Sequence, residues 1–154
     1  PEAFEAAIER CHALFDALSV EPAGTFKLIS LRTNYMHNSN LANMPALKRE
    51  RHALNPLHIH PDDVIALGLG AEDRLVVSNQ FGAIETPFVV DDSLQPGVVA
   101  MSHGYGHARS FGLSRAHAAP GANVNALMPT GADSHEPLSN MAHLTGVTVK
   151  IGRA

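Results

Sequence analysis

The sequence predicts a mainly β fold with short helices. About six short strands form a closed or nearly closed barrel, and one helix precedes them at the N-terminus. Helical periodicity is confined to the first residues, and the apolar runs that follow are short and bounded by Gly, Pro, Asn or Asp. Such runs are typical of strands, and many short strands with few helices favour a barrel. At 154 residues the chain fits one such domain with a sizeable core.

Residues 2–18 are predicted to form an amphipathic helix, because apolar residues recur at steps of four and three along one face. These residues are Phe4, Ile8, Cys11, Phe15 and Leu18. We therefore expect Cys11 to be a small core residue. The Glu-Pro-Ala-Gly run at 21–24 ends the helix and divides the chain into a helix with linker, 1–24, and a barrel domain, 25–154. The helix either packs on the barrel or belongs to an upstream domain.

The rest of the chain alternates short strands with turns and loops. The six expected strands are Thr25–Leu31, Leu57–Ile59, Arg74–Ser78, Ala83–Val90, Val98–Met101 and Thr145–Ile151. The third and fourth form a hairpin, since Gly82 supplies its turn. Two long polar segments, 32–44 and 102–145, interrupt this pattern, and a segment as long as the second is uncommon unless it serves a function or is partly disordered.

Two short helices are predicted between the strands. Pro61 suits the first position of a helix, Asp62 favours its positive end, and Gly68 suits its C-terminal cap. A second short helix is expected over Pro45–His52, with the basic run at 48–51 exposed.

Charge and hydropathy argue against two classes of partner. The formal net charge is −4, from 11 Lys and Arg against 15 Asp and Glu, which disfavours a nucleic-acid-binding surface. Backbone N–H groups and hydroxyls can still hold phosphates. No apolar run approaches the roughly 20 residues that span a bilayer, and no secretory signal is present. We expect neither nucleic acid nor a membrane as a partner.

The sequence predicts neither a metal centre nor a catalytic nucleophile. Cys11 is the only cysteine, which excludes an internal disulfide, a Cys-rich zinc site and a resident iron–sulfur cluster. His58 and His60 share a strand face, and a second pair, His103 and His107, shares a loop. A dedicated metal site needs three or four ligands, and no HExxH motif occurs. No serine has the nucleophile-elbow context, so no residue is assigned a catalytic role.

Four motifs in order resemble one known domain. They are Leu57–Leu69 continuing through Ala71–Ser78 and Gly82–Ile84, then Val90–Val99 with its Pro-Gly, then Val124–Leu127, then the polar loop Asp133–Asn140. Together they resemble the molybdopterin dinucleotide-binding domain that closes the large subunit of the dimethyl sulfoxide reductase family, which includes formate dehydrogenases and nitrate reductases. The resemblance covers about residues 25–151 and implies a double-psi β-barrel. Glu72-Asp73 replaces the usual Gly-Asp, and 107–122 is longer than a minimal family loop.

The resemblance implies a cofactor and a parent enzyme. The cofactor is a bis(pterin guanine dinucleotide) that chelates Mo or W, and it is not expected on the isolated domain. Upstream domains of the same polypeptide are the expected partners, and they carry the metal-ligating residue and the iron–sulfur cysteines. The isolated chain is therefore not expected to be active. Pro1, in place of an initiating Met, fits a fragment.

Three loops carry side chains suited to this ligand. The first offers a guanidinium, hydroxyls and amides for phosphate, ribose and pterin edges. Glycines in the second let the backbone approach a ligand beside rings that can stack on it, and the third offers amides and a carboxylate for the pterin and guanine. The assigned cofactor-binding residues are Arg32, Thr33, His37, Asn38 and Ser39 in the first loop, His103, Gly104 and Tyr105 in the second, and Asn125, Asp133 and Asn140 in the third.

Other interpretations stay open at this point. Asn, Ser, Asp and Gly are also common turn formers, so these loops can be purely structural. The chain can also be a stand-alone small subunit with the same barrel, as in formylmethanofuran dehydrogenases. A third alternative is a cofactor-free double-psi interaction module, like those at the N-terminus of certain ATPases. The ligand site requires residues 32–40, 102–107 and 125 to lie together.

Overall fold

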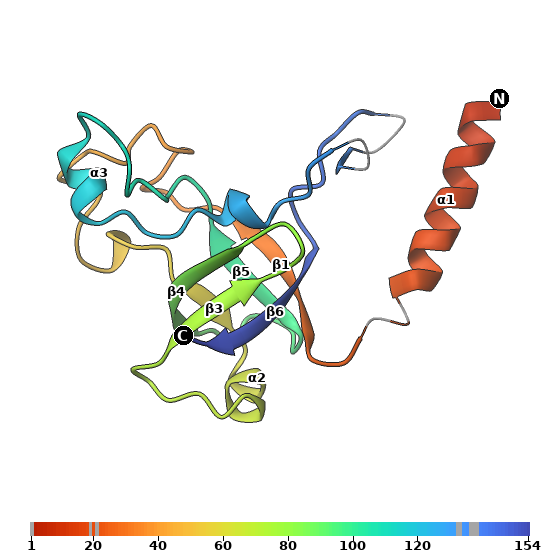
Figure 1. The fold of residues 1–154 in the computed structure, drawn as a ribbon, viewed down its shortest axis with the longest axis horizontal. Coiled ribbons are helices and arrows are strands. Elements are labelled where there is room, and N and C mark those ends of the chain that lie inside the picture. Colours follow the sequence, from red (N-terminus) through yellow and green to blue (C-terminus); the bar gives the residue numbers. More distant parts are fainter. Residues whose placement is uncertain (1, 19, 21, 132–133, 136–138) are drawn as a thin grey trace.

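A computed structural model describes residues 2–18, 20, 22–131, 134–135 and 139–154. Six strands close into one barrel in the order β1-β5-β2-β4-β3-β6 (Figure 1). Their bounds are β1 Thr25–Leu31, β2 Leu57–Ile59, β3 Arg74–Ser78, β4 Ala83–Val90, β5 Val98–Ser102 and β6 Val147–Arg153. The helices are α1 Glu2–Leu18, η1 Glu50–His52, α2 Pro61–Ala66, α3 Ser114–Ala118 and η2 Val124–Leu127. The predicted mainly β barrel with an N-terminal helix is confirmed.

The barrel is mixed, and its two parallel pairings decide where the loops meet. β1 runs parallel to β5, and β2 runs parallel to β4. The other four pairings are antiparallel. In the first parallel pair, Leu31 lies opposite Ser102 at the carboxyl ends of both strands. The segments that follow β1 and β5 therefore leave the barrel side by side, although about 70 residues separate them in sequence.

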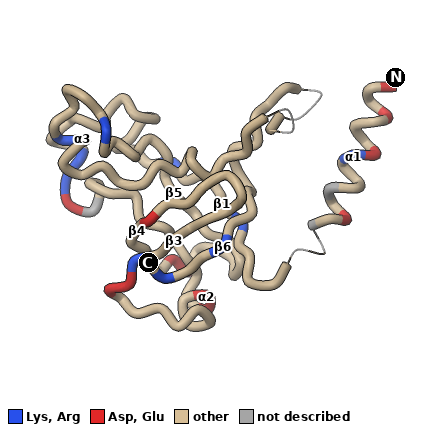
Figure 2. Tube along the Cα trace, in the orientation of Figure 1, with Lys and Arg blue, Asp and Glu red and all other residues tan. Residues whose placement is uncertain are grey.

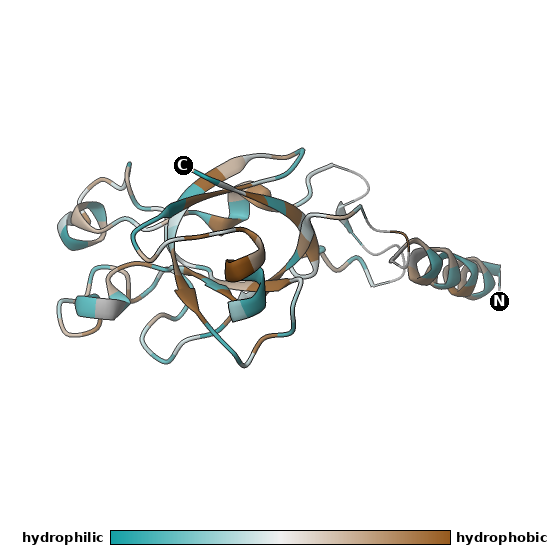
Figure 3. Cartoon of the chain, turned by 90° about the horizontal axis from the view of Figure 1, so that it is seen from below, coloured by the Kyte–Doolittle hydropathy of each residue, from teal (hydrophilic) through white to brown (hydrophobic). Residues whose placement is uncertain are grey.

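Alternating burial along the strands builds the core. In β3, Leu75 and Val77 are fully buried while the residues between and beside them are not. Side chains on a strand point alternately to opposite faces, so one face of each strand fills the barrel. Leu127 of η2 is also fully buried in the same cluster. Figure 3 shows strongly apolar segments along the barrel strands.

One predicted strand, β6, has different ends in the structure, whereas a predicted helix end is confirmed. β6 starts at Val147 rather than Thr145, because Gly146 has a φ of +70° and belongs to the turn before the strand. β6 then continues to Arg153, which pairs with Leu75 of β3. The helix expected to end at Gly68 does stop there: α2 ends at Ala66, and Gly68 adopts a left-handed φ of +63°.

The predicted helix at Pro45–His52 is wrong, and the predicted exposure of the basic run is wrong at Lys48, whereas Arg49 and Glu50 are exposed as predicted. The segment forms turns and then only the short 3-10 helix η1. Glu50 has a φ of +50°, which an α-helix does not accommodate. Lys48 is 2% exposed, and its Nζ donates to the carbonyl oxygen of Ala53 at 3.0 Å.

Helix α1 is confirmed, but it lies to one side of the barrel (Figure 1). Phe4 is 65% and Phe15 75% exposed. Cys11 is exposed as well, so its predicted core position is wrong. The amphipathic pattern correctly indicated a helix, but the barrel does not cover its apolar face. None of the described helices is long and apolar enough to cross a bilayer.

The long segment after β5 contains more regular structure than expected. It carries α3 and η2, joined by a short irregular segment. The side-chain oxygen of Asn43 accepts from the backbone N–H groups of Arg115 and Ala116 at 3.0 and 3.2 Å, which holds the first turn of α3. Charged residues are scattered over the molecule rather than gathered on one face (Figure 2).

Candidate functional site

The segments that leave β1 and β5 border a cavity of about 800 Å³. Ligand pockets are typically about 300–1,000 Å³, so the space suits a sizeable small molecule. Its lining residues come from four parts of the chain: Leu28, Ile29, Ser30, Arg32, Asn38 and Ser39; Met101, His103, Gly104, Tyr105 and His107; Val124, Asn125 and Met128; and Leu144 and Thr145.

The polar wall of this cavity is a chain of hydrogen bonds that joins the two loops. Arg32 Nη1 donates to Asn38 Oδ1 at 3.3 Å. The same oxygen lies 2.9 Å from His103 Nε2, and His103 Nδ1 lies 3.2 Å from the hydroxyl of Ser30. An imidazole that donates from Nε2 to the amide oxygen accepts at Nδ1 from the serine hydroxyl. These contacts therefore accommodate a neutral His103 beside the guanidinium.

The electrostatics of the wall are cationic. Burial, and secondly the positive charge of Arg32, lowers the pKa of the His103 imidazole below its ordinary value. No Asp or Glu is among the lining residues of this cavity in the described part of the chain. The wall therefore offers a fixed positive charge, amides and hydroxyls to an anionic ligand.

Gly104 allows the two loops to touch. It has a φ of +89°, and a Cβ built on it would lie 1.9 Å from the carbonyl oxygen of Asn38. Asn38 itself has a φ of +52°, a left-handed conformation that asparagine tolerates. Only glycine at position 104 permits this approach, and the approach brings the His103 imidazole to the Asn38 side chain.

Asn55 fastens the second loop to the segment that leads to η2. Its Nδ2 donates to the carbonyl oxygens of Ser102 and Ala122 at 2.8 and 2.9 Å, and its Oδ1 accepts from Ala122 N at 2.9 Å. The residue is 2% exposed. A Cβ on Gly121 would lie 2.5 Å from Asn55 Oδ1, so this contact also depends on a glycine. Sequence reasoning missed Asn55, because an Asn before Pro56 has the signature of an ordinary turn.

Tyr105 is held beneath the cavity by residues from the segment before β2. Its hydroxyl donates to the carbonyl oxygen of His52 at 3.1 Å, and Lys48 Nζ lies 4.4 Å from its ring centroid. Tyr35 stacks on the His52 ring at 3.5 Å. Burial lowers the pKa of Lys48, while burial and then Tyr35 raise the pKa of Tyr105. The cation–π contact therefore joins the segment between β1 and β2 to the segment that follows β5.

The structure brings most of the predicted site residues together. Seven of them line the cavity: Arg32, Asn38, Ser39, His103, Gly104, Tyr105 and Asn125. Thr33, His37 and Asn140 are not among its lining residues, and Asp133 lies outside the described residues. Thr33 Oγ1 is buried and has no hydrogen-bond partner among the described residues, whereas His37 and Asn140 are exposed.

Several lining residues were not assigned to the site from the sequence. Ser30 and His107 were not assigned to the site, nor were Leu144 and Thr145. Ser30 lies within a strand and Thr145 just before another, so neither stands in a recognisable loop motif. The required proximity of residues 32–40, 102–107 and 125 is nevertheless met, because all three segments line one cavity.

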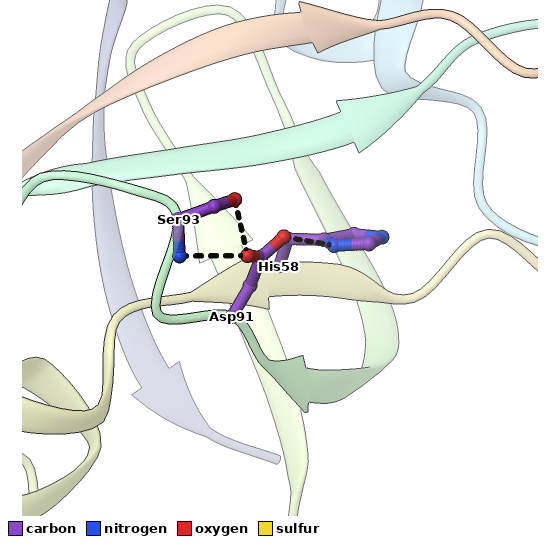
Figure 4. Close-up of polar contacts among 3 residues, drawn as sticks. All are labelled: His58, Asp91 and Ser93. Carbon is purple, nitrogen blue, oxygen red and sulfur yellow. Dashed lines mark hydrogen bonds and ion pairs between the residues drawn. The ribbon is translucent and has the colours of Figure 1, made fainter.

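His58 and His60 serve structural contacts away from this cavity. His58 Nδ1 lies 2.9 Å from Asp91 Oδ2, and Asp91 Oδ1 accepts from the Ser93 backbone and hydroxyl (Figure 4). His60 Nδ1 accepts from Asp62 N and caps α2. Over the described residues, no group of three or more His, Cys, Asp or Glu side chains is placed to hold a metal ion.

Comparison with known proteins identifies the family of the chain, a protein of similar sequence and a structure of similar fold. Residues 26–145 match the family model described as "Molydopterin dinucleotide binding domain". A tetrathionate reductase subunit of Salmonella typhimurium (strain LT2) is 34% identical over 89 residues, which is 58% of this chain and 8% of that protein. The fold is similar to that of acetylene hydratase from Pelobacter acetylenicus, with a TM-score of 0.68 and 17% identity over 84% of this chain. The chain covers 18% of that second protein, so it spans only a small part of either relative.

Proposed function

Because the chain belongs to the molybdopterin dinucleotide-binding domain family, we propose that the cavity between the β1 and β5 loops holds the guanosine pyrophosphate part of a pterin guanine dinucleotide. The single observation that carries this proposal is the meeting of Arg32, Asn38, His103 and Asn125 at one cavity. In a parent oxidoreductase, the bound Mo or W supplies redox or oxo-transfer chemistry. This chain supplies binding and orientation.

The donor set fits such a group. A guanidinium is suited to bidentate contact with phosphate oxygens, and Ser39 adds a hydroxyl from the same loop. Asn125 of η2 is an exposed member of the lining, and its amide can pair with a pterin or guanine edge. The absence of carboxylates from the described lining avoids repulsion of a pyrophosphate.

The buried parts of the lining favour a flat ring as well as a phosphate. Met101 and Val124 are buried members of the lining, and Leu144 is an exposed one. Apolar side chains beside a few polar groups are typical of small-molecule sites. A ligand that combines charged groups with aromatic rings suits this mixed lining.

The parent is proposed to be an enzyme of the formate dehydrogenase and nitrate reductase type, in which upstream domains complete the site. Thr33, His37, Asp133 and Asn140 remain proposed contacts. They lie outside the lining or outside the described residues, and a completed cofactor site extends beyond this cavity. A stand-alone subunit would use the same cavity, whereas a cofactor-free interaction module would not bind nucleotide.

Substitution of Arg32 tests the proposal. We expect Arg32→Gln to weaken binding of guanosine diphosphate to the 154-residue chain at least several-fold, since a hydrogen bond to a charged group contributes about 1.5–3 kcal/mol. Arg74→Gln is the matched control, because Arg74 is an exposed residue of β3 that pairs with Glu85 away from the cavity. Equal affinity of the two variants, measured by calorimetry, contradicts the proposed site.

A further inference from the structure

We propose that His103 takes up a proton when a pyrophosphate diester binds beside Arg32, so that nucleotide binding at this cavity is coupled to pH. This inference rests on the proposed function and extends it by coupling nucleotide binding to proton uptake. It concerns an imidazole of this chain and requires no bound metal.

The geometry joins the imidazole to the anion-binding group. His103 Nε2 and Arg32 Nη1 approach the same atom, Asn38 Oδ1, at 2.9 and 3.3 Å. A phosphate that contacts the guanidinium therefore lies near the imidazole as well. The electrostatic interaction of two unit charges falls off only slowly over such distances in a partly buried site.

Both protonation states of His103 can be hydrogen-bonded in place. In the neutral ring, Nε2–H donates to Asn38 and Nδ1 accepts from the Ser30 hydroxyl. In the charged ring, Nδ1–H donates to the Ser30 oxygen at the same 3.2 Å separation, and only the hydroxyl hydrogen turns. Protonation requires no movement of the loops.

Charge decides which state is populated. In the free protein, burial and Arg32 hold the pKa of His103 below its ordinary value. The other ionisable lining residues are Tyr105 and His107, both on the same loop, while β1, the 124–128 segment and residues 144–145 contribute none to the lining. No described lining group offsets the positive charge. A pyrophosphate supplies that missing negative charge and so favours the imidazolium.

The sign of the coupling follows from this shift. A pKa that is higher in the bound state than in the free state means that binding takes up protons. The added affinity is complete below the free-state pKa and is lost as the pH rises through the bound-state pKa. We therefore expect binding to weaken several-fold between about pH 5.5 and 7.5, the range in which histidine titrates.

Calorimetry of the 154-residue chain with guanosine diphosphate mannose tests the inference. This probe contains a guanosine pyrophosphate diester, whose phosphates do not titrate near neutral pH. Titration at pH 6.5 in two buffers of different ionisation enthalpy, MES and Bis-Tris at equal ionic strength, gives the number of protons taken up. We expect roughly half a proton or more for the unsubstituted chain. We expect almost none for His103→Gln, which keeps hydrogen bonding but cannot become charged.

A control and a second readout assign the proton. His117→Gln, on the exposed surface of α3, should take up as many protons as the unsubstituted chain. Imidazole NMR titration of the unsubstituted chain should show the pKa of His103 rising when the probe binds, and this result does not depend on whether His103→Gln folds.

The outcomes separate the inference from the proposed function. Binding without proton uptake, or uptake that persists in a folded His103→Gln variant, overturns the inference and leaves the cavity as a nucleotide site. No binding of the probe at millimolar concentration overturns both. Proton uptake that disappears only with His103 supports both.

Discussion

At the scale of single residues, the site depends on a few contacts that only one side chain can make. Asn55 supplies both donors and an acceptor to backbone groups of two separate segments. Gly104 lies where the two loops touch, and a side chain at this position would collide with the Asn38 carbonyl oxygen. Neither role needs a charged or reactive group. Residues that shape a ligand site can therefore escape a search for reactive chemistry.

Removal of the Asn55 amide should destabilise the whole domain. Asn55→Ala leaves two buried carbonyl groups and one N–H without their partner, and each loss is expected to cost about 1 kcal/mol or more. We expect the free energy of unfolding in urea to fall by roughly 3 kcal/mol. Asn34→Ala, at an exposed loop position, should change it by less than about 0.5 kcal/mol. A loss of similar size in both variants would show that the hydrogen bonds of Asn55 do not stabilise the domain.

Gly104→Ala should impair both stability and ligand binding, and Gly112→Ala separates the two causes. Both glycines have a left-handed φ, +89° and +75°, but only the first has a neighbour where the Cβ would lie. Each substitution incurs roughly 1–2 kcal/mol for its backbone conformation. The collision with Asn38 adds about 1–3 kcal/mol at position 104. Urea unfolding measures the stability of each variant, and nucleotide titration measures its affinity. Equal stability and equal affinity of the two variants would contradict the proposed contact between the loops at Gly104.

At the scale of elements, the parallel pairing of β1 with β5 is the feature that creates the site. It directs both following segments to one edge of the barrel, while Leu127 of η2 packs into the barrel core. β2 is antiparallel to β5, so β2 and β4 end at the other edge of the barrel. There His58 contacts Asp91. The candidate site and this structural pair therefore lie at opposite edges of the same barrel.

The contact between His58 and Asp91 should make the free energy of unfolding depend on pH in the acid range. Hydrogen bonding from Ser93, and then from His58, holds the pKa of Asp91 below its ordinary value. Such a carboxyl stabilises the fold above its unfolded-state pKa, and the contribution is lost as the pH falls through its lower folded-state pKa. We expect the urea midpoint of Asp91→Asn to fall less steeply below about pH 4 than that of the unsubstituted chain. Asp92→Asn, at the exposed neighbouring position, is the control, and parallel pH profiles for all three proteins would contradict this role.

Helix α1 should be dispensable for the barrel. We propose that residues 1–24 and 25–154 are separate units, since Phe4 and Phe15 remain largely exposed. Removal of residues 1–24 should leave the amide NMR spectrum of the barrel strands almost unchanged. Loss of dispersed signals on truncation would show instead that the helix is part of the folded unit.

At the scale of the whole molecule, the sequence predicted the elements well and their long-range contacts poorly. β1 and β2 begin and end where alternation and turn residues placed them. Lys48 is buried because Tyr105, which is distant in sequence, covers its ammonium group, and no local pattern contains that information. The cavity likewise draws Ser30, His103 and Thr145 from three segments that only barrel closure brings together. The resemblance named seven of the residues that line the cavity, and only the structure shows that the others line it as well.

The most direct test of the central claim is an amide NMR titration of the 154-residue chain with guanosine diphosphate. A cavity that holds the guanosine pyrophosphate should show shifts concentrated at residues 30–39, 102–107, 124–128 and 144–145, which contain the lining residues and their neighbours. A weak response in these segments still satisfies the prediction, since the chain spans only a small part of its relatives. No shifts at millimolar nucleotide, or shifts confined to α2 and the β3–β4 turn, would contradict the claim and favour a cofactor-free interaction module.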